Sequence, residues 1–142
     1  MTIIESLYEY FKNCPLLDED RKLNISFLPA DKREYVISVI PTSNIVKTYI
    51  DGTSLRQYLF TFGTSEYFDA DTQQNLFNCG FFENLAAWLE KQSNAKNFPE
   101  LAENQTPTKI QAQTTGYLMS AYDGNNARYQ IQCCLTYRQG RN

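Results

Sequence analysis

Residues 109–138, KIQAQTTGYLMSAYDGNNARYQIQCCLTYR, contain the pattern that decides the fold. Apolar and polar side chains alternate over 128–138, as they do in a strand with one buried face. The segment 109–122 has a second strand pattern, and the sequence DGNN at 123–126 favours a tight turn between the two. The sequence therefore predicts a long antiparallel hairpin. Its expected buried side chains are Tyr129, Ile131, Cys133, Leu135 and Tyr137.

Two amphipathic helices are expected before this hairpin. The first covers 2–13, with Thr2 as the cap of a capping box. The second begins at a capping Asp69 or Asp71 and runs to about residue 92. Apolar residues at helical spacing predict its buried stripe. That stripe consists of Leu76, Phe77, Phe81, Leu85, Trp88 and Leu89.

Several shorter strands are expected around these helices. The segments 23–28 and 34–40 have strand patterns, and the short link between them favours a hairpin. The segment 45–50 is also strand-like. Large side chains occupy both faces of 55–62, which is typical of a strand that is covered on both sides or lies at an interface. No regular structure is predicted for 63–68.

This order of elements predicts an α+β fold in a single domain spanning 1–142. We expect a mostly antiparallel sheet of four to five strands with two helices packed on it. Residues 94–107 form a polar linker, with Phe98 and Leu101 as apolar anchors. A chain of this length buries a core without disulfides. We therefore expect reduced cysteines that act as small apolar residues: Cys14, Cys79, Cys133 and Cys134.

The composition excludes several classes of function. The 142 residues include no histidine, the commonest general base and metal ligand. The cysteine spacing fits no zinc motif. The net charge of −3 comes without a basic stripe, which argues against binding to a nucleic-acid backbone. The opening MTIIESLYEYF is acidic where a signal peptide is basic, and no apolar run is long enough to span a membrane. These features predict a cytoplasmic protein.

Pairs of acidic residues are the remaining route to a metal site or to acid–base catalysis. Glu66 lies near Asp69, Asp69 lies near Asp71, and 18–20 is a denser acidic cluster. No calcium-loop pattern surrounds them, and Asp69 and Asp71 suit the start of a helix. A cysteine inside a strand lacks the basic environment that a reactive thiolate needs. We therefore expect a protein that is not an enzyme, with no catalytic, cofactor-binding or metal-binding residues.

Three stretches carry a family resemblance. Residues 2–41, TIIESLYEYFKNCPLLDEDRKLNISFLPADKREYVISVIP, combine a short helix with strands. Residues 55–93, LRQYLFTFGTSEYFDADTQQNLFNCGFFENLAAWLEKQS, are a strand followed by an aromatic-bearing helix. Residues 110–139, IQAQTTGYLMSAYDGNNARYQIQCCLTYRQ, are the closing strand pair. In this layout the chain resembles the tail terminator and minor tail proteins of long-tailed bacteriophages and prophages of Gram-positive bacteria.

The resemblance implies a structural role. Tail terminators of this kind have an α+β fold and form a ring, commonly of six subunits, that caps the tail tube and presents a surface for joining the head. It implies the tail tube protein and head–tail connector proteins as partners. It implies no cofactor and no sequence readout of nucleic acid. The implied location is the cytoplasm of the bacterial host during assembly and then the virion tail.

A ring subunit needs surfaces for its neighbours, and aromatic and arginine side chains are favoured at such surfaces. The irregular, tyrosine-bearing middle section and the tip of the closing hairpin supply candidates. The sequence therefore predicts subunit-interface residues Tyr49, Arg56, Tyr67, Phe68 and Arg128.

Two other functions stay open. One is a non-catalytic module that binds a small molecule or peptide in a pocket between the sheet and the helix at 77–88. The other is an enzyme with a metal site built from carboxylates, which the absence of histidine disfavours.

Overall fold

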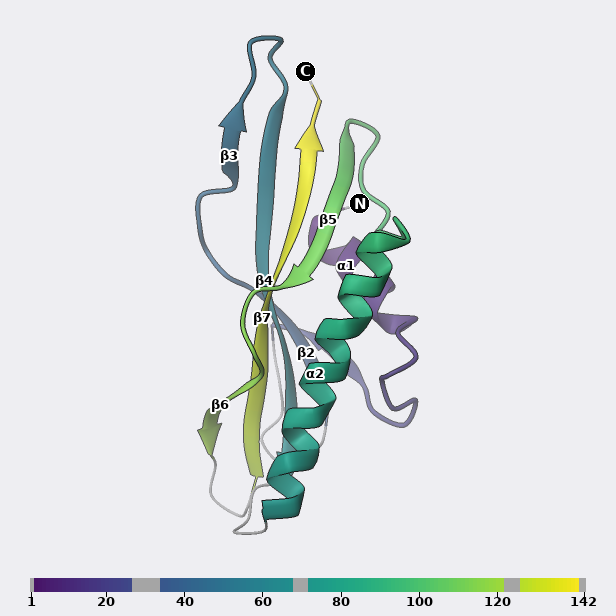
Figure 1. The fold of residues 1–142 in the computed structure, drawn as a ribbon, viewed down its shortest axis with the longest axis vertical. Coiled ribbons are helices and arrows are strands. Elements are labelled where there is room, and N and C mark those ends of the chain that lie inside the picture. Colours follow the sequence, from purple (N-terminus) through teal and green to yellow (C-terminus); the bar gives the residue numbers. More distant parts are fainter. Residues whose placement is uncertain (1, 27–33, 68–71, 122–125, 141–142) are drawn as a thin grey trace.

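The computed structural model of the chain describes residues 2–26, 34–67, 72–121 and 126–140. Within these ranges, two helices lie on one side of a twisted seven-stranded sheet (Figure 1). The mixed α and β content and the mainly antiparallel pairing agree with the predicted α+β class. In chain order the elements are α1 (Ile3–Lys12), β1 (Leu23–Ile25), β2 (Tyr35–Val39), β3 (Ile45–Thr48), β4 (Ser54–Tyr67), α2 (Thr72–Asn94), β5 (Gln105–Ala112), β6 (Tyr117–Ala121) and β7 (Asn126–Gln139).

Strands β4 and β7 form the centre of the sheet. They pair antiparallel along 14 residues each, from Ser54 opposite Gln139 to Tyr67 opposite Asn126. The free edge of β7 pairs with β5 at the Gln139 end of the ladder and with β6 at the Asn126 end. The free edge of β4 pairs with β3 at the Ser54 end and with β2 toward the Tyr67 end. The ladder twists so strongly that β5 and β6 lie on opposite sides of it in Figure 1. The two ends of the β4–β7 ladder therefore have different neighbouring strands.

The sheet has seven strands rather than the predicted four to five. The strand expected over 109–122 is divided into β5 and β6 because 113–116 interrupts it. In this interruption Gly116 lies so close to α2 that a Cβ on it would be 2.4 Å from Cβ of Phe82. The strand expected over 55–62 continues to Tyr67, since polar side chains after Gly63 remain in register with β7. The turn expected at 123–126 lies mainly outside the described residues.

The predicted hairpin of the first two strands is wrong. β1 and β2 run parallel, with Leu23 opposite Tyr35. Ser26 leaves β1 with a left-handed φ of 61°, and its N–H donates to the carbonyl of Ile37 (2.9 Å). The two strands therefore begin at the same edge of the sheet and cannot form a hairpin. Strand patterns alone do not distinguish parallel from antiparallel pairing, and the short link between the strands favoured the antiparallel hairpin.

The hydrophobic core lies between the ladder and the helices. Phe60 and Phe62 of β4 are completely buried, and their ring centroids lie 5.8 and 5.2 Å from that of Phe11 in α1. The apolar set predicted for 128–138 is buried in β7 as expected. Thr2 caps α1, since its Oγ1 accepts a hydrogen bond from the N–H of Glu5 (3.3 Å).

Helix α2 covers the same core. Its predicted stripe is confirmed at Leu85 and Leu89, and Phe82, absent from the prediction, is buried with them. Phe81 and Trp88 are half-buried against the core. The side chains of Leu76 and Phe77 lie outside what the structure describes. Neither helix, over the residues described, is long and apolar enough to cross a lipid bilayer.

The predicted linker at 94–107 is partly confirmed. Phe98 and Leu101 pack against the core as expected. β5 nevertheless begins inside this segment, at Gln105, and contains Pro107. Proline is tolerated there because β5 is an edge strand whose pairing with β7 shifts register between Pro107 and Lys109.

Candidate interaction surface

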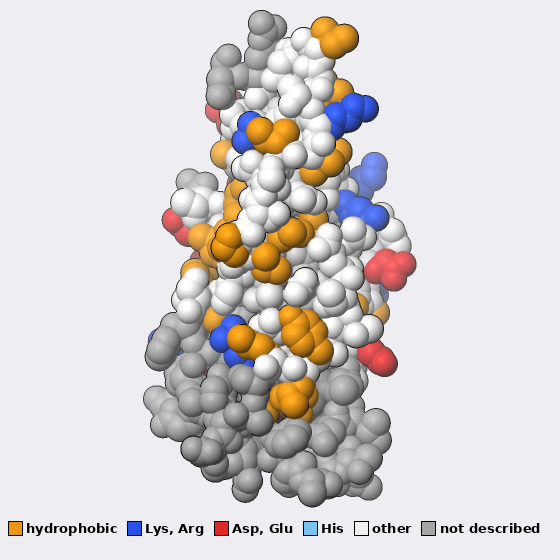
Figure 2. Space-filling view, turned by 90° about the vertical axis from the view of Figure 1, so that its left-hand side faces the viewer, with side chains coloured by type: hydrophobic (Ala, Val, Ile, Leu, Met, Phe, Trp, Pro, Cys, Tyr) orange, Lys and Arg blue, Asp and Glu red, His pale blue; other side chains and the backbone are white. Residues whose placement is uncertain are grey.

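The side of the molecule that carries β3 and β6 leaves large apolar side chains in water. Figure 2 looks onto this side, and apolar atoms gather along its length. About half of each of these side chains is exposed, and Ile50 is fully exposed. Single exposed apolar residues are ordinary, whereas a group of them marks an interaction site. Because β3 and β6 lie at opposite ends of the ladder, the group here has two separate parts. We call this group the β3–β6 side; it consists of Ile45, Val46, Ile50, Leu118 and Met119.

β3 contributes strongly to this surface because all its residues, Ile45–Thr48, are exposed. Its pairing with β4 shifts register between Ile45 and Lys47. A bulge and a charged side chain on an edge strand both hinder the addition of another strand. Contacts at β3 are therefore expected through its side chains rather than its backbone.

The turn from Tyr49 to Thr53, between β3 and β4, is held by its own hydrogen bonds. The N–H of Tyr49 donates to the carbonyl of Thr53 (2.8 Å), and Gly52 adopts a left-handed φ of 89° that favours glycine. Oδ1 of Asp51 accepts from both Oγ1 and N–H of Thr53 (2.7 and 3.0 Å). These bonds, that of the hydroxyl first, lower the pKa of Asp51. The ordered turn therefore holds Ile50 out in water.

Two predicted interface residues support this turn. The ring of Tyr49 lies 4.8 Å from the guanidinium carbon of Arg138 and 5.4 Å from Nζ of Lys47. Such cation–π contacts favour the ring's position. Arg56 is half-buried in β4, and its Nε donates to Oγ of Ser54 (3.0 Å). Both residues thus brace the hairpin instead of projecting from it.

Of the other three predicted interface residues, the structure describes the side chain of Arg128. Arg128 lies within β7 and is half-buried beside Gly63, where a Cβ would be 3.5 Å from its Nε. Tyr67 ends β4, and its side chain is not described. Phe68 lies outside the described residues. Arg128 therefore lies at the opposite end of the ladder from Tyr49 and Arg56.

Sequence reasoning missed the β3–β6 side, although a signal was present. Successive side chains in a strand point to opposite faces, so two adjacent large apolar residues cannot both face one core. Ile45 is adjacent to Val46 and Leu118 to Met119, and each of these four is about half exposed. Adjacent apolar residues in a short edge strand are thus the pattern that indicates this surface.

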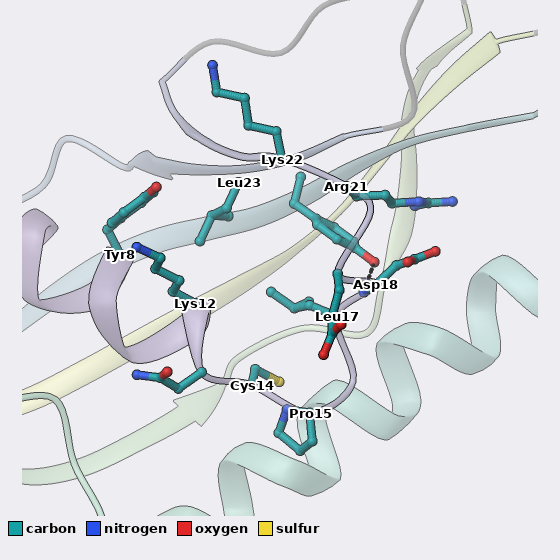
Figure 3. A pocket seen from close by; sticks show the side chains of 12 residues that line it. Tyr8, Lys12, Cys14, Pro15, Leu17, Asp18, Arg21, Lys22 and Leu23 are labelled. Carbon is teal, nitrogen blue, oxygen red and sulfur yellow. Dashed lines mark hydrogen bonds between the residues drawn. The ribbon is translucent and has the colours of Figure 1, made fainter.

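A cleft of about 570 Å³ lies between α1, the loop 13–22 and β2 (Figure 3). Charges of both signs line it, and several are already engaged. Nζ of Lys12 lies 5.8 Å from the ring centre of Tyr8. The N–H of Asp18 donates to the hydroxyl of Tyr35 (2.9 Å), and burial raises the pKa of that tyrosine. Lys22 points out of the cleft in Figure 3.

Arg21, beside this cleft, makes a mostly buried ion pair with Glu66 of β4. Nη2 of Arg21 donates to Oε1 of Glu66 (2.8 Å), and Nη1 donates to Oε2. The two side chains are only 12% and 8% exposed. The hydrogen bond to Glu66 raises the pKa of Arg21. Glu66, a candidate for metal binding or catalysis on sequence grounds, therefore ties the loop 13–22 to the sheet.

The described cysteines behave as core residues. Cys14, Cys133 and Cys134 are buried and unpaired. Burial raises the pKa of each thiol, which opposes formation of a reactive thiolate. The predicted apolar role is confirmed for these three, and the side chain of Cys79 lies outside what the structure describes.

The remaining acidic candidates do not form a described metal site. Asp69 and Asp71 lie outside the described residues. In the ranges that the structure covers, no group of three cysteine, aspartate or glutamate residues is placed to hold a metal ion. No protein-family model matches the sequence, and none of the curated proteins matches it. The surfaces of this chain are therefore the features that indicate its function.

Proposed function

We propose that the protein is a structural subunit of a phage tail, a tail terminator or tail completion protein that self-associates into a closed ring. The ring caps the tail tube and joins it to the head, with the tail tube protein and connector proteins as partners. Support for the tail role comes from the resemblance of the sequence layout. Support for self-association comes from the described surface.

The observation that carries self-association is the β3–β6 side. Burying a large aliphatic side chain contributes about 1.5–3 kcal/mol, and roughly half of that gain is unused at each half-exposed position. β3 and β6, the strands that contain Ile45, Val46, Leu118 and Met119, lie along one side of the molecule, whereas the helices cover another. Contact with a further copy would remove these side chains from water. A contact that joins two different surfaces closes a ring when its repeated rotation completes a full turn, and otherwise forms an open filament.

A small-molecule or peptide-binding module is the second candidate, because the cleft in Figure 3 has a volume common for ligand sites. Two of its cations are engaged, Arg21 by Glu66 and Lys12 by Tyr8. A cleft of about 510 Å³ lies between α2 and β5, where this alternative places its pocket, and Glu83, Glu90 and Lys109 are among the residues that line it. The deeper space between the sheet and α2 is occupied by buried side chains. These are Phe82, Leu85 and Leu89.

The test is the mass of the purified chain over a concentration series, by light scattering after size exclusion, with particles imaged by electron microscopy. We expect a closed ring of about six subunits, as symmetric oligomers allow. A strict monomer at every concentration would contradict spontaneous ring formation. Stabilisation by a small ligand in the same preparation would favour the binding module.

A variant pair connects this mass to the β3–β6 side. Val46→Glu combined with Met119→Glu places two charges on that side and is expected to lower the mass at a fixed concentration. Leu16→Glu is the matched control, because Leu16 is an exposed apolar residue of the loop 13–22. Thermal melting of all three proteins checks that the fold is retained.

A further inference from the structure

We propose that the turn Tyr49–Thr53 of one copy inserts Ile50 into a groove beside α1 of a second copy. The inference rests on the proposed self-association and adds which two surfaces meet. It assigns the turn as the projecting element and the α1 groove as the receiving one.

The turn is suited to project because it is ordered before any contact is made. Hydrogen bonds within Tyr49–Thr53 fix its backbone, and Tyr49 is held between Lys47 and Arg138. A fully exposed Ile50 therefore pays no backbone-ordering entropy when it is buried. An apolar side chain on a rigid turn is a typical anchor for a pocket on a partner.

The receiving groove has a volume of about 420 Å³ and lies between α1 and residues 98–100. The half-buried rings of Tyr10 and Phe98 provide apolar surface along it, and Asn13 adds polar atoms at its edge. The hydroxyl of Tyr10 donates to the carbonyl of Asn97 (2.9 Å), so the two walls are joined. The groove is thus formed in the isolated chain and is apolar enough for an isoleucine.

Charge complementarity favours a second copy as the occupant. Exposed Glu9 and Glu100 line the groove. Exposed Lys47 and Arg138 flank Tyr49 at the base of the turn, while the carboxylate of Asp51 is bonded to Thr53 within the turn. The turn therefore presents Ile50 together with two cations and the ionised carboxylate of Asp51 to a groove that carries two carboxylates. Opposite charges of this kind set orientation and suppress wrong partners.

The two surfaces lie on different sides of one chain. In Figure 1 the turn is at the upper left end of the ladder, whereas α1 lies on the right behind α2. The contact must therefore be made between copies and is head-to-tail, the kind that generates rings. Stable interfaces bury roughly 800 Å² on each partner, more than one turn covers. The neighbouring Ile45 and Val46 of β3 extend the same contact.

The first experiment mixes two variants that each lose one surface. Ile50→Asp removes the anchor and leaves the groove, whereas Glu9→Lys with Glu100→Lys reverses the groove and leaves the anchor. Each alone is expected to raise the concentration for half-assembly at least about tenfold, which corresponds to about 1.4 kcal/mol. An equimolar mixture is expected to form a 1:1 dimer, since one intact contact remains. Unchanged melting temperatures show that both variants fold.

The second experiment locates the contact by cross-linking. Ile50→Cys is mixed with Glu100→Cys, both in a Cys79→Ser background, and oxidised; Cys14, Cys133 and Cys134 are buried. A disulfide forms only where the two Cα atoms come within about 7 Å. The expected product is a mixed dimer. The control pairs Ile50→Cys with Glu19→Cys in the cleft of Figure 3, where no cross-link is expected.

The outcomes separate this inference from the proposed function. A ring that persists in Ile50→Asp, or a variant mixture that stays monomeric while the wild-type chain assembles, overturns the inference and leaves the ring. If Ile50→Cys and Glu100→Cys cross-link but the wild-type chain assembles without forming a closed ring, the inference is supported and the ring is overturned. A wild-type chain that is monomeric at all concentrations overturns both.

Discussion

On the helix side of the ladder, Phe60 and Phe62 are completely buried against Phe11. On the β3–β6 side, Ile45 and Val46 are about half exposed, although they are just as apolar as core residues. The difference lies in what covers them: α1 and α2 pack over the first group, and all of β3 is exposed. Hydrophobicity alone therefore does not decide burial in this sheet. The uncovered group can be changed with little effect on folding, which makes the comparison testable.

The largest effect is expected from Phe62→Ala on the covered side. Phe62 is completely buried among aromatic rings, so its removal leaves a cavity. We expect the free energy of unfolding to fall by about 3–5 kcal/mol, measured by urea denaturation. A loss below about 1 kcal/mol would show that this side is not closely packed.

A slightly smaller effect is expected from Glu66→Gln, which removes the carboxylate facing Arg21. A mostly buried guanidinium without its carboxylate costs about 3 kcal/mol of stability. The control is the double variant Arg21→Met with Glu66→Leu, which removes both charges and is expected to recover most of the loss. If the double variant is no more stable than Glu66→Gln, the loss does not come from an unpaired buried charge, and the ion pair itself stabilises the fold.

Gly116→Ala tests how closely the break between β5 and β6 approaches α2. The new Cβ would lie 2.4 Å from Cβ of Phe82, which cannot rotate away. Overpacking of this kind costs about 1–3 kcal/mol, seen as a lower urea midpoint. Gly80→Ala is the control, because a Cβ on Gly80 meets no atom within 4 Å. That control is expected to retain the wild-type midpoint or raise it.

Alkaline pH should lower the free energy of unfolding because of the buried thiol of Cys133 on the covered side. Burial raises the pKa of this thiol, so the folded chain keeps its proton while the unfolded chain releases it above about pH 8.5. Unfolding is then favoured as pH rises, and stability that is constant below that pH falls above it. Urea midpoints at pH 7 and 9.5 measure the loss. Cys133→Ala should lose less over this interval, and an equal loss would assign the effect to other groups.

The smallest effect on folding is expected from Ile45→Ser on the β3–β6 side. Because Ile45 is about half exposed in an edge strand, the free energy of unfolding should change by no more than about 0.5 kcal/mol. Self-association, measured by light scattering, should weaken in the same variant. A large loss of stability with unchanged mass would reverse the comparison and indicate an intramolecular role.

Sequence patterns predicted the covered side well because each of its elements has a single buried face. The alternation over 128–138 and the helical spacing of Leu85 and Leu89 place the correct side chains in the core. The parallel direction of β1 was not predictable, since periodicity shows which residues form a strand but not the direction in which it pairs. The exposed group was also missed, because large apolar residues are assumed to be buried until the covering elements are placed.

The position of β7 along the chain has a consequence for synthesis. β7 pairs with β4, β5 and β6, so three of the six other strands have it as a neighbour. Its partner in the ladder, β4, is separated from it by α2 and two strands, and Ser54 meets Gln139 only across this whole intervening segment. Contacts between residues so distant in sequence slow folding. While a ribosome is still making β7, the nascent chain therefore exposes one whole edge of β4, and a chaperone has its longest opportunity to bind there before Gln139 emerges.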